Sequence, residues 1–302
     1  MIEILRTEKI IKRFYQGKAT ILAVDEVDFD LKEGETLGLV GESGSGKSTL
    51  GKLLIGLLKP SSGNLYLNGK SLEQYSRLEK ARLIQMVFQD WQSSLNPKMP
   101  ISKILSEGWM IHRYNKKELE QKLLKLAEDF ELDPDILKRT PRELSGGQLQ
   151  RVTIARALSI NPKILIADEP TSSLDTTLRR QVLELFKSKI NQMGLSLIII
   201  SHDLDAVVSL ASKVLIMFRG KIVEMGSPDQ ILKTPIHPYT LRLIYPGQFP
   251  DPEGNWEKLN GDFSWGNGCP FTGVCQNTMK ICYEKLPFWK NYGSGHWALC
   301  HV

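Results

Sequence analysis

The chain has 302 residues, of which 41% are hydrophobic, and a formal net charge of +5 at pH 7. This length allows one large domain with an appendage, and the composition is ordinary for a protein that builds its own core. No run approaches the roughly 18 consecutive apolar residues of a membrane-spanning helix, and no basic stripe alternates with aromatic residues, which disfavours membrane-embedded and nucleic-acid-binding proteins. The N-terminus lacks the basic and apolar regions of a signal peptide, which predicts that the protein stays in the cytoplasm.

The first part of the chain predicts a small antiparallel β layer. Strand patterns occur at residues 2–7 and 23–31, and a hairpin at residues 64–67 ends in the turn Asn68-Gly69. Between them, an apolar run at residues 36–40 predicts a buried strand, and an apolar stretch at residues 49–58 predicts a helix. The β layer therefore continues on both sides of the segment that joins this strand to this helix.

The second part of the chain predicts a helical region followed by parallel strands. Residues 100–160 are mostly helical in pattern. Residues 163–167 and 195–200 are nearly all apolar, as parallel strands buried on both faces must be, and a helical stretch at residues 178–192 separates them. This order predicts a right-handed βαβ unit. Residues 246–265 are rich in Pro, Gly, Asn and Asp, which suggests a linker into a small loop-rich module.

Residues 41–48 read Gly-Glu-Ser-Gly-Ser-Gly-Lys-Ser, the phosphate-binding pattern G-x-x-x-x-G-K-[ST]. Glycine lets the backbone bend so that its N–H groups point at phosphate oxygens, and the following helix directs the positive end of its dipole there. Lys47 would reach the β- and γ-phosphates and Ser48 would hold Mg²⁺. The alternative, a structural turn without a ligand, has no need of Lys-Ser at its end. The predicted nucleotide-binding residues here are Gly41, Ser43, Gly44, Ser45, Gly46, Lys47, Ser48 and Thr49.

Two acids and a histidine follow the two apolar strands. Asp168 and Glu169 come after residues 163–167, and His202 comes after residues 195–200. At the carboxyl edge of a parallel sheet, Asp168 would hold Mg²⁺ through water, Glu169 would orient or deprotonate the attacking water, and His202 would contact the γ-phosphate. The alternatives are a solvent-facing acidic strand end and a structural histidine.

A second glycine-rich segment, Leu-Ser-Gly-Gly-Gln at residues 144–148, leads into a helix and predicts a second anion site. Its place between the phosphate loop and residues 164–169 resembles the signature of the ATP-binding cassette (ABC) ATPases, over residues 1 to about 240. The resemblance implies an α/β P-loop NTPase with an antiparallel β subdomain, a RecA-like core, a helical subdomain at about residues 92–160 and a small cysteine-containing C-terminal module. The predicted domains are residues 1–244, the nucleotide-binding domain, and residues 245–302, the linker with the module.

The resemblance also implies roles for single residues. In that family two subunits sandwich two ATP molecules head to tail, so Ser145, Gly147 and Gln148 would close over ATP held by the partner. Gln89 matches the glutamine that touches Mg²⁺ and links to the transmembrane partner. Asp175 lies in the loop that joins the protomers, where this chain has Ser-Ser-Leu-Asp and the family more often has Ser-Ala-Leu-Asp. Phe14, with Tyr15 as its rival, would stack on adenine; the alternative for both is packing in the β layer.

Residues 88–97 and 235–240 are similar to the ATPase subunits of oligopeptide, dipeptide and nickel importers. Members of that branch often end in a Cys-Pro-Phe segment, found here at residues 269–271, with further cysteines that bind a [4Fe-4S] cluster. The four cysteines lie within the last 34 residues, and a tetrahedral Zn²⁺ site or four reduced thiols are the alternatives. Val274 stands where relatives commonly place arginine, and His296 and His301 are alternative ligands. The implied ligands are Cys269, Cys275, Cys282 and Cys300.

These motifs predict the ATP-hydrolysing subunit of an ABC importer of peptides or related solutes, with nickel and metal chelates left open. The implied partners are a second ABC ATPase subunit, either a paralogue or a copy of this chain, two transmembrane permease subunits and an extracytoplasmic solute-binding protein, without nucleic acid. The protein would lie peripherally on the cytoplasmic face of the cell membrane. The alternatives are a non-transport ABC ATPase of DNA repair or translation, which usually has a coiled-coil insert or two cassettes, and a non-catalytic ABC scaffold.

Overall fold

The structure is a computed structural model that describes residues 2–17, 19–90, 94–111, 115–172, 174–248, 268–272 and 274–302. It contains two compact units, one of residues 1–74 and 199–302 and the other of residues 75–198. Most of the predicted linker at residues 246–265 lies outside the described residues. Within the described part of the chain, no helix combines the length and the apolar character that crossing a membrane requires.

The first unit contains a four-stranded antiparallel sheet in the order β2-β1-β4-β5. Its strands are β1 (Glu3–Gln16), β2 (Ala19–Lys32), β4 (Ser62–Leu67) and β5 (Lys70–Ser71). Asn68 and Gly69 both have positive φ angles in the turn between β4 and β5, as a two-residue hairpin of type I′ requires. β1 extends well beyond the predicted residues 2–7. Register shifts interrupt its pairing with β2 and break the alternation of apolar residues, so the sequence pattern indicated only the first part of the strand.

A second sheet of the first unit carries the phosphate loop. β3 (Thr36–Val40) pairs in parallel with β9 (Lys213–Phe218), and β9 pairs antiparallel with β10 (Lys221–Gly226). Beyond β10 come β12 (Trp297–Leu299) and β11 (Trp289–Asn291), both antiparallel. The cysteine module, predicted to be rich in loops, therefore adds two short strands beyond β10 to the sheet that contains β3.

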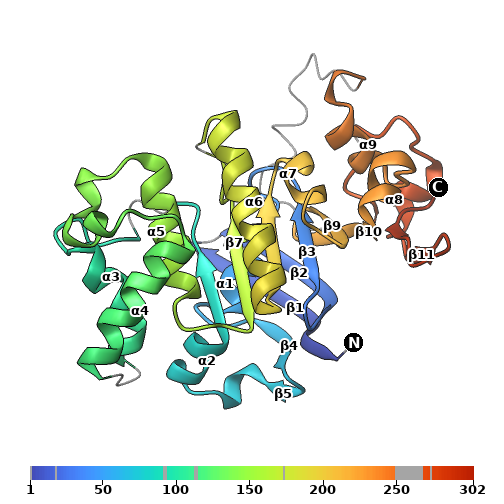
Figure 1. The fold of residues 1–302 in the computed structure, drawn as a ribbon. Coiled ribbons are helices and arrows are strands. Elements are labelled where there is room, and N and C mark those ends of the chain that lie inside the picture. The colour runs from blue at the N-terminus through green and yellow to red at the C-terminus, as the bar shows by residue number, and fades with distance from the viewer. Residues whose placement is uncertain are drawn as a thin grey trace. The chain divides into compact units, whose positions relative to one another are not determined.

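Short helices complete the first unit, and in Figure 1 the orange and red elements of its C-terminal part gather around β10. Gly38 in β3 allows a close approach of α7 (Leu204–Val208), because a Cβ atom there would lie 2.1 Å from Val207 Cγ1. The helices are α1 (Lys47–Leu54), α7 (Leu204–Val208), α8 (Pro228–Lys233), α9 (Pro238–Ile244) and α11 (Lys280–Glu284), with the 3₁₀ turns η1 (Leu72–Gln74) and η4 (Pro246–Gln248).

The second unit combines the predicted helical region with two parallel strands. The indole nitrogen of Trp109 donates to the carbonyl oxygen of Ser159 at 2.8 Å, which joins α3 (Ile101–Ile111) to the end of α5 (Gly146–Leu158). The division between the units falls inside β8 (Ser196–Ser201), which is fully buried. The other elements are α2 (Arg77–Leu83), β6 (Ile84–Val87), α3 (Ile101–Ile111), α4 (Lys116–Asp129), η2 (Pro134–Lys138), η3 (Pro141–Glu143), α5 (Gly146–Leu158), β7 (Ile164–Asp168) and α6 (Thr176–Met193), of which β6 and β7 pair in parallel.

Candidate functional site

The phosphate loop joins β3 to α1, as the sequence predicted. Gly46 is the N-cap of α1 with φ 106°, in the left-handed region that favours glycine. A Cβ atom on Gly46 would lie 2.1 Å from the carbonyl oxygen of Ala23, and one on Gly41 would lie 2.2 Å from that of Met217. Gly46 is therefore required both by its backbone conformation and by close packing against β2. Gly41 is required by close packing against β9.

Lys47 lies inside the loop that it follows. Its side chain is buried, and Nζ donates to the carbonyl oxygens of Gly41 at 2.6 Å and Glu42 at 2.8 Å. The amide of Gly220 donates to the carbonyl oxygen of Ser45 at 2.9 Å, which ties the loop to the turn after β9. A bent backbone, an ammonium group and a helix N-terminus at one place are what a site for phosphate oxygens requires.

Glu42, the second residue of the loop, has partners that the sequence did not predict. Its amide donates to the hydroxyl oxygen of Tyr239 at 2.9 Å, and its carboxylate pairs with Arg242 at 3.1 Å. Both partners belong to α9. In the sequence, residues 235–240 overlap α9, but they indicated only a similarity to one branch of a family. They did not predict a contact between α9 and the phosphate loop.

In the second unit, β7 ends in the predicted acidic pair. Asp168 and Glu169 are both buried, which rules out the alternative of a solvent-facing acidic strand end. Glu169 has φ 49°, and its carbonyl oxygen accepts from the Ser172 hydroxyl at 3.2 Å. A non-glycine residue in the left-handed region is strained, and such strain is typical of functional sites.

The segment predicted as a second anion site caps α5. Ser145 Oγ accepts from the amide of Gln148 at 3.4 Å, and Gln148 Oε1 accepts from the amide of Ser145 at 3.0 Å, a capping box. Ser145 is exposed, so the N-terminus of this helix faces solvent. A Cβ atom on Gly147 would lie 3.1 Å from Leu178 Cδ2, so this residue packs closely on α6.

The remaining predicted nucleotide residues occupy loops and strand ends. Gln89 is exposed two residues after the end of β6, and His202 is exposed directly after β8. Asp175 is the N-cap of α6, and its side chain accepts from the amide of Leu178 at 2.9 Å. Phe14 and Tyr15 lie on β1, where Phe14 is 36% exposed and Tyr15 is 77% exposed.

All four cysteines line one small cavity at the C-terminal end of the first unit, together with His237, Phe271 and Thr278. They are free of disulfide bonds. Burial raises the pKa of the Cys269 thiol to about 11 and also raises the pKa of Cys275 and of Cys300, and neighbouring thiols add to each rise. Within the residues that the structure describes, no group of three or more His, Cys, Asp or Glu side chains is placed to hold a metal ion.

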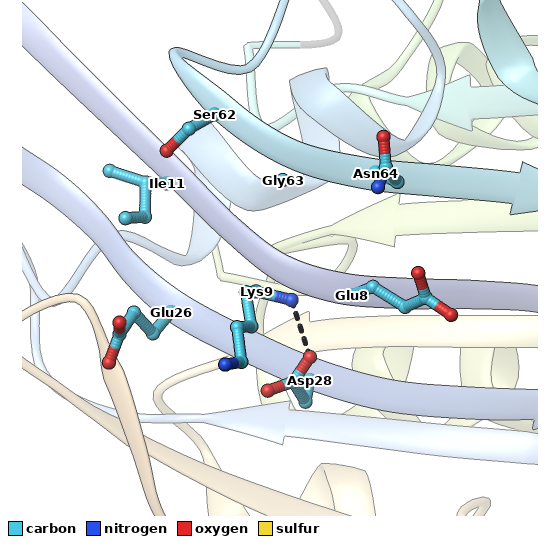
Figure 2. Close-up of a pocket in the computed structure, with 8 residues that line it drawn as sticks. All are labelled: Glu8, Lys9, Ile11, Glu26, Asp28, Ser62, Gly63 and Asn64. Atoms are coloured by element: carbon cyan, nitrogen blue, oxygen red, sulfur yellow. Dashed lines mark hydrogen bonds between the residues drawn. The ribbon is translucent and has the colours of Figure 1, made fainter.

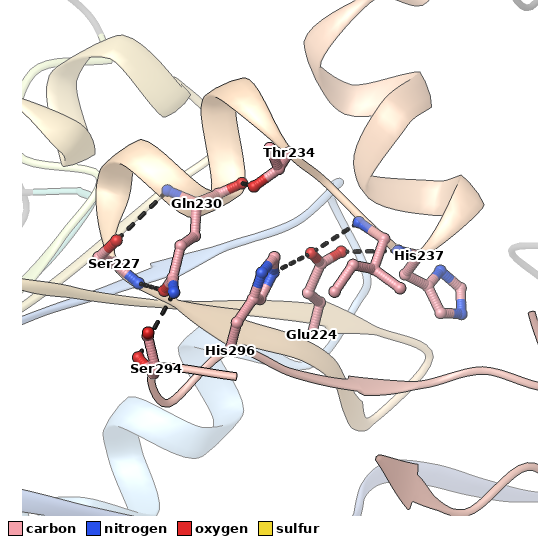
Figure 3. Close-up of polar contacts among 8 residues, drawn as sticks. Glu224, Ser227, Gln230, Thr234, His237, Ser294 and His296 are labelled. Atoms are coloured by element: carbon pink, nitrogen blue, oxygen red, sulfur yellow. Dashed lines mark hydrogen bonds and ion pairs between the residues drawn. The ribbon is translucent and has the colours of Figure 1, made fainter. Parts of the chain in front are cut away.

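Of the two histidines suggested as alternative ligands, His301 also lines the cysteine cavity, and both have partners within the protein. His296 Nε2 lies 2.7 Å from the carboxylate of Glu224, and His301 Nε2 lies 2.9 Å from the carbonyl oxygen of Lys285. Glu224 is fully buried and also accepts from the amides of Ile236 and His237, both at 2.9 Å, as Figure 3 shows. The carboxylate of β10 therefore joins the segment before α9 to the cysteine module.

A separate pocket on the antiparallel sheet, shown in Figure 2, is lined by acidic side chains but contains none of the predicted nucleotide residues. The acids are engaged by the protein itself. Asp28 accepts from the amide of Lys9, Glu26 pairs with Lys221 at 3.4 Å, and Glu8 pairs with Arg6 at 3.1 Å. Nothing in this pocket indicates a ligand.

Comparisons with known proteins agree with this arrangement. The profile of the family described as ABC transporter matches residues 24–172, and that of the oligopeptide/dipeptide transporter C-terminal region matches residues 223–282. The chain is 38% identical to the putative oligopeptide transport ATP-binding protein YkfD of Bacillus subtilis, over all of this chain and 96% of the relative. It is 39% identical to the oligopeptide transport ATP-binding protein OppF of Haemophilus influenzae, over 95% of this chain and 90% of the relative.

Solved structures extend the comparison. The ATP-binding cassette MJ0796, solved as a dimer bound to ADP and Pi in a post-hydrolysis state, matches 74% of this chain and 99% of its own with a TM-score of 0.68 and 27% identity. CbiO1 of Clostridium perfringens, part of the ABC transporter complex CbiONQ, matches 85% of this chain and all of its own with a TM-score of 0.69 and 27% identity.

Proposed function

Since the chain belongs to the ABC transporter family and hydrolyses ATP, we propose that it is the subunit whose ATP cycle drives an importer of peptides or related solutes. The observation that supports this is the phosphate-binding pattern at residues 41–48, where Lys47 donates to the carbonyl oxygens of Gly41 and Glu42, in a chain that also matches the C-terminal region of oligopeptide and dipeptide transporters. Import rather than DNA repair or translation fits the relatives, which are named as peptide transport and peptide import proteins.

ATP closes a dimer of cassettes and its hydrolysis reopens it, which switches the transmembrane subunits between two states. Lys47 binds the β- and γ-phosphates, and Ser48, Gln89 and Asp168 supply hard oxygen ligands of the kind that Mg²⁺ prefers. Phe14 stacks on adenine. The exposed N-terminus of α5, with Ser145, Gly147 and Gln148, binds the ATP of the partner subunit, and Asp175 lies at the same junction.

Glu169 and His202 act on the attacking water. The buried carboxylate of Glu169 orients it or takes its proton, and His202 holds the γ-phosphate and the water in line. Catalysis here is mainly positioning and charge stabilisation, because phosphoryl transfer requires little covalent chemistry from the protein.

The decisive experiment is Glu169→Gln, which keeps the shape of the side chain and removes its basicity. We expect ATP hydrolysis in the assembled complex to fall by at least two orders of magnitude, the usual contribution of a general base, while ATP binding is retained. Glu184→Gln, an exposed glutamate of α6 that pairs with Arg180, is the matched control. Undiminished hydrolysis by Glu169→Gln would remove the proposed mechanism, and loss of binding would show a structural role.

The four cysteines would hold a [4Fe-4S] cluster. Their thiols line one cavity of about 10 Å³, and the raised pKa values of Cys269, Cys275 and Cys300 mean that positive charge is needed to keep these three as thiolates. A single Zn²⁺ requires four sulfurs about 2.3 Å from one point, whereas a cluster separates its ligands by its own iron and sulfide atoms.

An absorption spectrum of anaerobically purified protein, with iron and zinc counts, tests the cysteine site. A brown protein with absorption near about 400 nm and about four iron atoms supports the cluster. A colourless protein with one zinc, or with neither metal, contradicts it. Cys282→Ser should abolish the colour, and substitution of the exposed Ser294 by Ala should leave it unchanged.

The same proposal supplies the partners and the location. The chain would pair with a second ABC ATPase, a paralogue or a copy of itself, and dock on two permease subunits that receive solute from an extracytoplasmic binding protein. It would lie peripherally on the cytoplasmic face of the membrane. Co-purification from membranes with the permeases tests this, and recovery with DNA-repair or ribosomal proteins would favour the non-transport alternative.

A further inference from the structure

The phosphate loop contains an unexpected anion. Glu42 stands second in a loop that receives a triphosphate, and its carboxylate is 33% exposed. A free carboxylate in this position would repel the nucleotide, because charges a few ångströms apart interact strongly at a partly buried site. A residue that neutralises Glu42 would therefore lower this repulsion.

Arg242 supplies that neutralisation. Its guanidinium lies 3.1 Å from the Glu42 carboxylate, and its side chain is only 15% exposed. Arg242 stands three residues after Tyr239, so both side chains lie on the same face of α9. One helix face thus contacts the carboxylate and the backbone of the same loop residue.

Tyr239 holds the backbone of Glu42. Its hydroxyl accepts the Glu42 amide at 2.9 Å, and its ring is fully buried. On the other side of that residue, the Glu42 carbonyl accepts from Lys47, which also binds the carbonyl of Gly41. The hydroxyl of Tyr239 therefore fixes the residue whose carbonyl holds the phosphate-binding lysine.

The ring of Tyr239 is held in turn by the cysteine module. Its centroid lies 4.5 Å from that of Phe218 and 5.9 Å from that of Phe271, and Phe218 and Phe271 meet edge to face at 5.3 Å. Phe271 is buried and stands two residues after Cys269, in the wall of the cavity that all four cysteines line. The contacts form a continuous path from the cysteine cavity through Phe271 and Tyr239 to Glu42.

We propose that Tyr239 and Arg242 are positioning residues for ATP binding, which fix and neutralise Glu42, and that Phe271 makes this positioning depend on the packing of the cysteine module. A loop already held in its binding conformation avoids the entropic cost of ordering when the nucleotide arrives. Loosening the module moves the Tyr239 ring and weakens the hold on Glu42. The module thereby sets the nucleotide affinity of the loop.

The test is the affinity of the full-length chain for Mg-ATP, measured by calorimetry well below the unfolding temperature. Tyr239→Phe removes the hydroxyl, keeps the ring and leaves a buried amide without its acceptor. We expect about tenfold weaker binding, equivalent to about 1.4 kcal/mol. Tyr245→Phe, which removes the hydroxyl of an exposed tyrosine at the end of the same helix, should bind ATP like the unmodified chain. Unchanged affinity in Tyr239→Phe, with only a lower unfolding temperature, would mean a purely structural role.

A charge-rescue pair tests Arg242 separately. Arg242→Gln leaves the Glu42 carboxylate unpaired, so we expect weaker ATP binding by several-fold, with an increased dependence on salt because exposed charge is screened. Adding Glu42→Gln removes the repulsion and should restore most of the affinity. If the double variant binds as weakly as Arg242→Gln alone, Arg242 does not act through Glu42 and the proposal is wrong on this point.

The dependence on the module is tested by Phe271→Leu in two backgrounds. In the unmodified chain this change should weaken ATP binding several-fold, since the ring that packs on Tyr239 is lost. In the Tyr239→Phe background it should have little further effect, because the hydroxyl that transmits it is already absent. Additive effects on affinity, or no effect of Phe271→Leu in either background, would refute a path through Tyr239.

Discussion

The buried histidine before α9 gives a pH dependence of stability that can be worked out from the structure. His237 is 1% exposed, and its Nδ1 accepts from the amide of Tyr239 at 3.1 Å as the N-cap of α9. Burial lowers the pKa of His237 to about 3, whereas an unfolded histidine has a pKa of about 6.5. Between these values the unfolded chain binds a proton that the folded chain does not, so stability falls as the pH decreases.

The size of this loss follows from the two pKa values. Linkage at a single group predicts a decrease of about 2 kcal/mol in the free energy of unfolding from pH 7 to pH 5, and a negligible change above about pH 7.5. His237→Asn removes the titration and keeps a side chain that caps a helix well. The variant should be less stable by a constant amount at high pH, because a buried ring is lost, and should lose about 2 kcal/mol less than the unmodified chain on going to pH 5.

Urea unfolding followed by tryptophan fluorescence at pH 8, 7, 6 and 5 measures both chains. The difference between them isolates His237, since other titrating groups contribute equally to both. The difference in the free energy of unfolding between the two chains should decrease mainly between pH 6.5 and pH 5. If the free energies of unfolding of the two chains decrease in parallel over this range, the buried, neutral state of His237 is refuted. If the difference between them decreases between pH 8 and pH 7 instead, the effect belongs to another group.

Two further predictions concern backbone and core. Gly46→Ala should abolish ATP binding, because its Cβ would lie 2.1 Å from a β2 carbonyl oxygen. Gly34 also has a positive φ but no atom within 4 Å of its Cβ position, so the control Gly34→Ala should bind ATP normally. Equal ATP affinities of the two variants would refute the steric argument. Trp109→Phe should lower the free energy of unfolding by about 1–3 kcal/mol, since it leaves the Ser159 carbonyl of the helical region without its donor, and an unchanged urea midpoint would contradict this.

The parts of the fold that the sequence predicted are those fixed by local pattern. The phosphate loop at residues 41–48 depends on glycine at two positions and on a strand and helix directly beside it, so a short window contains the whole signal. The buried strands β7 and β8 were equally readable, because a strand covered on both faces is apolar throughout. The hairpin turn was predictable from Asn68-Gly69, because these residue types favour the positive φ angles that such a turn requires.

What the sequence did not predict depends on contacts between distant residues. Glu42 and Tyr239 are 197 positions apart, and no local pattern says that a tyrosine hydroxyl will meet a loop amide. The strands β11 and β12 have three residues each, too few for an alternation to be recognised, and exist because β10 offers an edge. His296 was taken as a possible metal ligand from its nearness to Cys300, but its position beside Glu224 is set by β12.

Glu224 links the cysteine module to α9, the helix that contacts the nucleotide loop. A fully buried carboxylate is costly unless its oxygens are satisfied, and here two amides before α9 and one imidazole from the module satisfy it. Removing the module would leave Glu224 without His296 and expose the edge of β10, so that Oε1 would keep only the Ile236 amide and Oε2 the His237 amide. The orientation of α9, and with it the positions of Tyr239 and Arg242 on the phosphate loop, therefore depends on a residue contributed from the last seven positions of the chain.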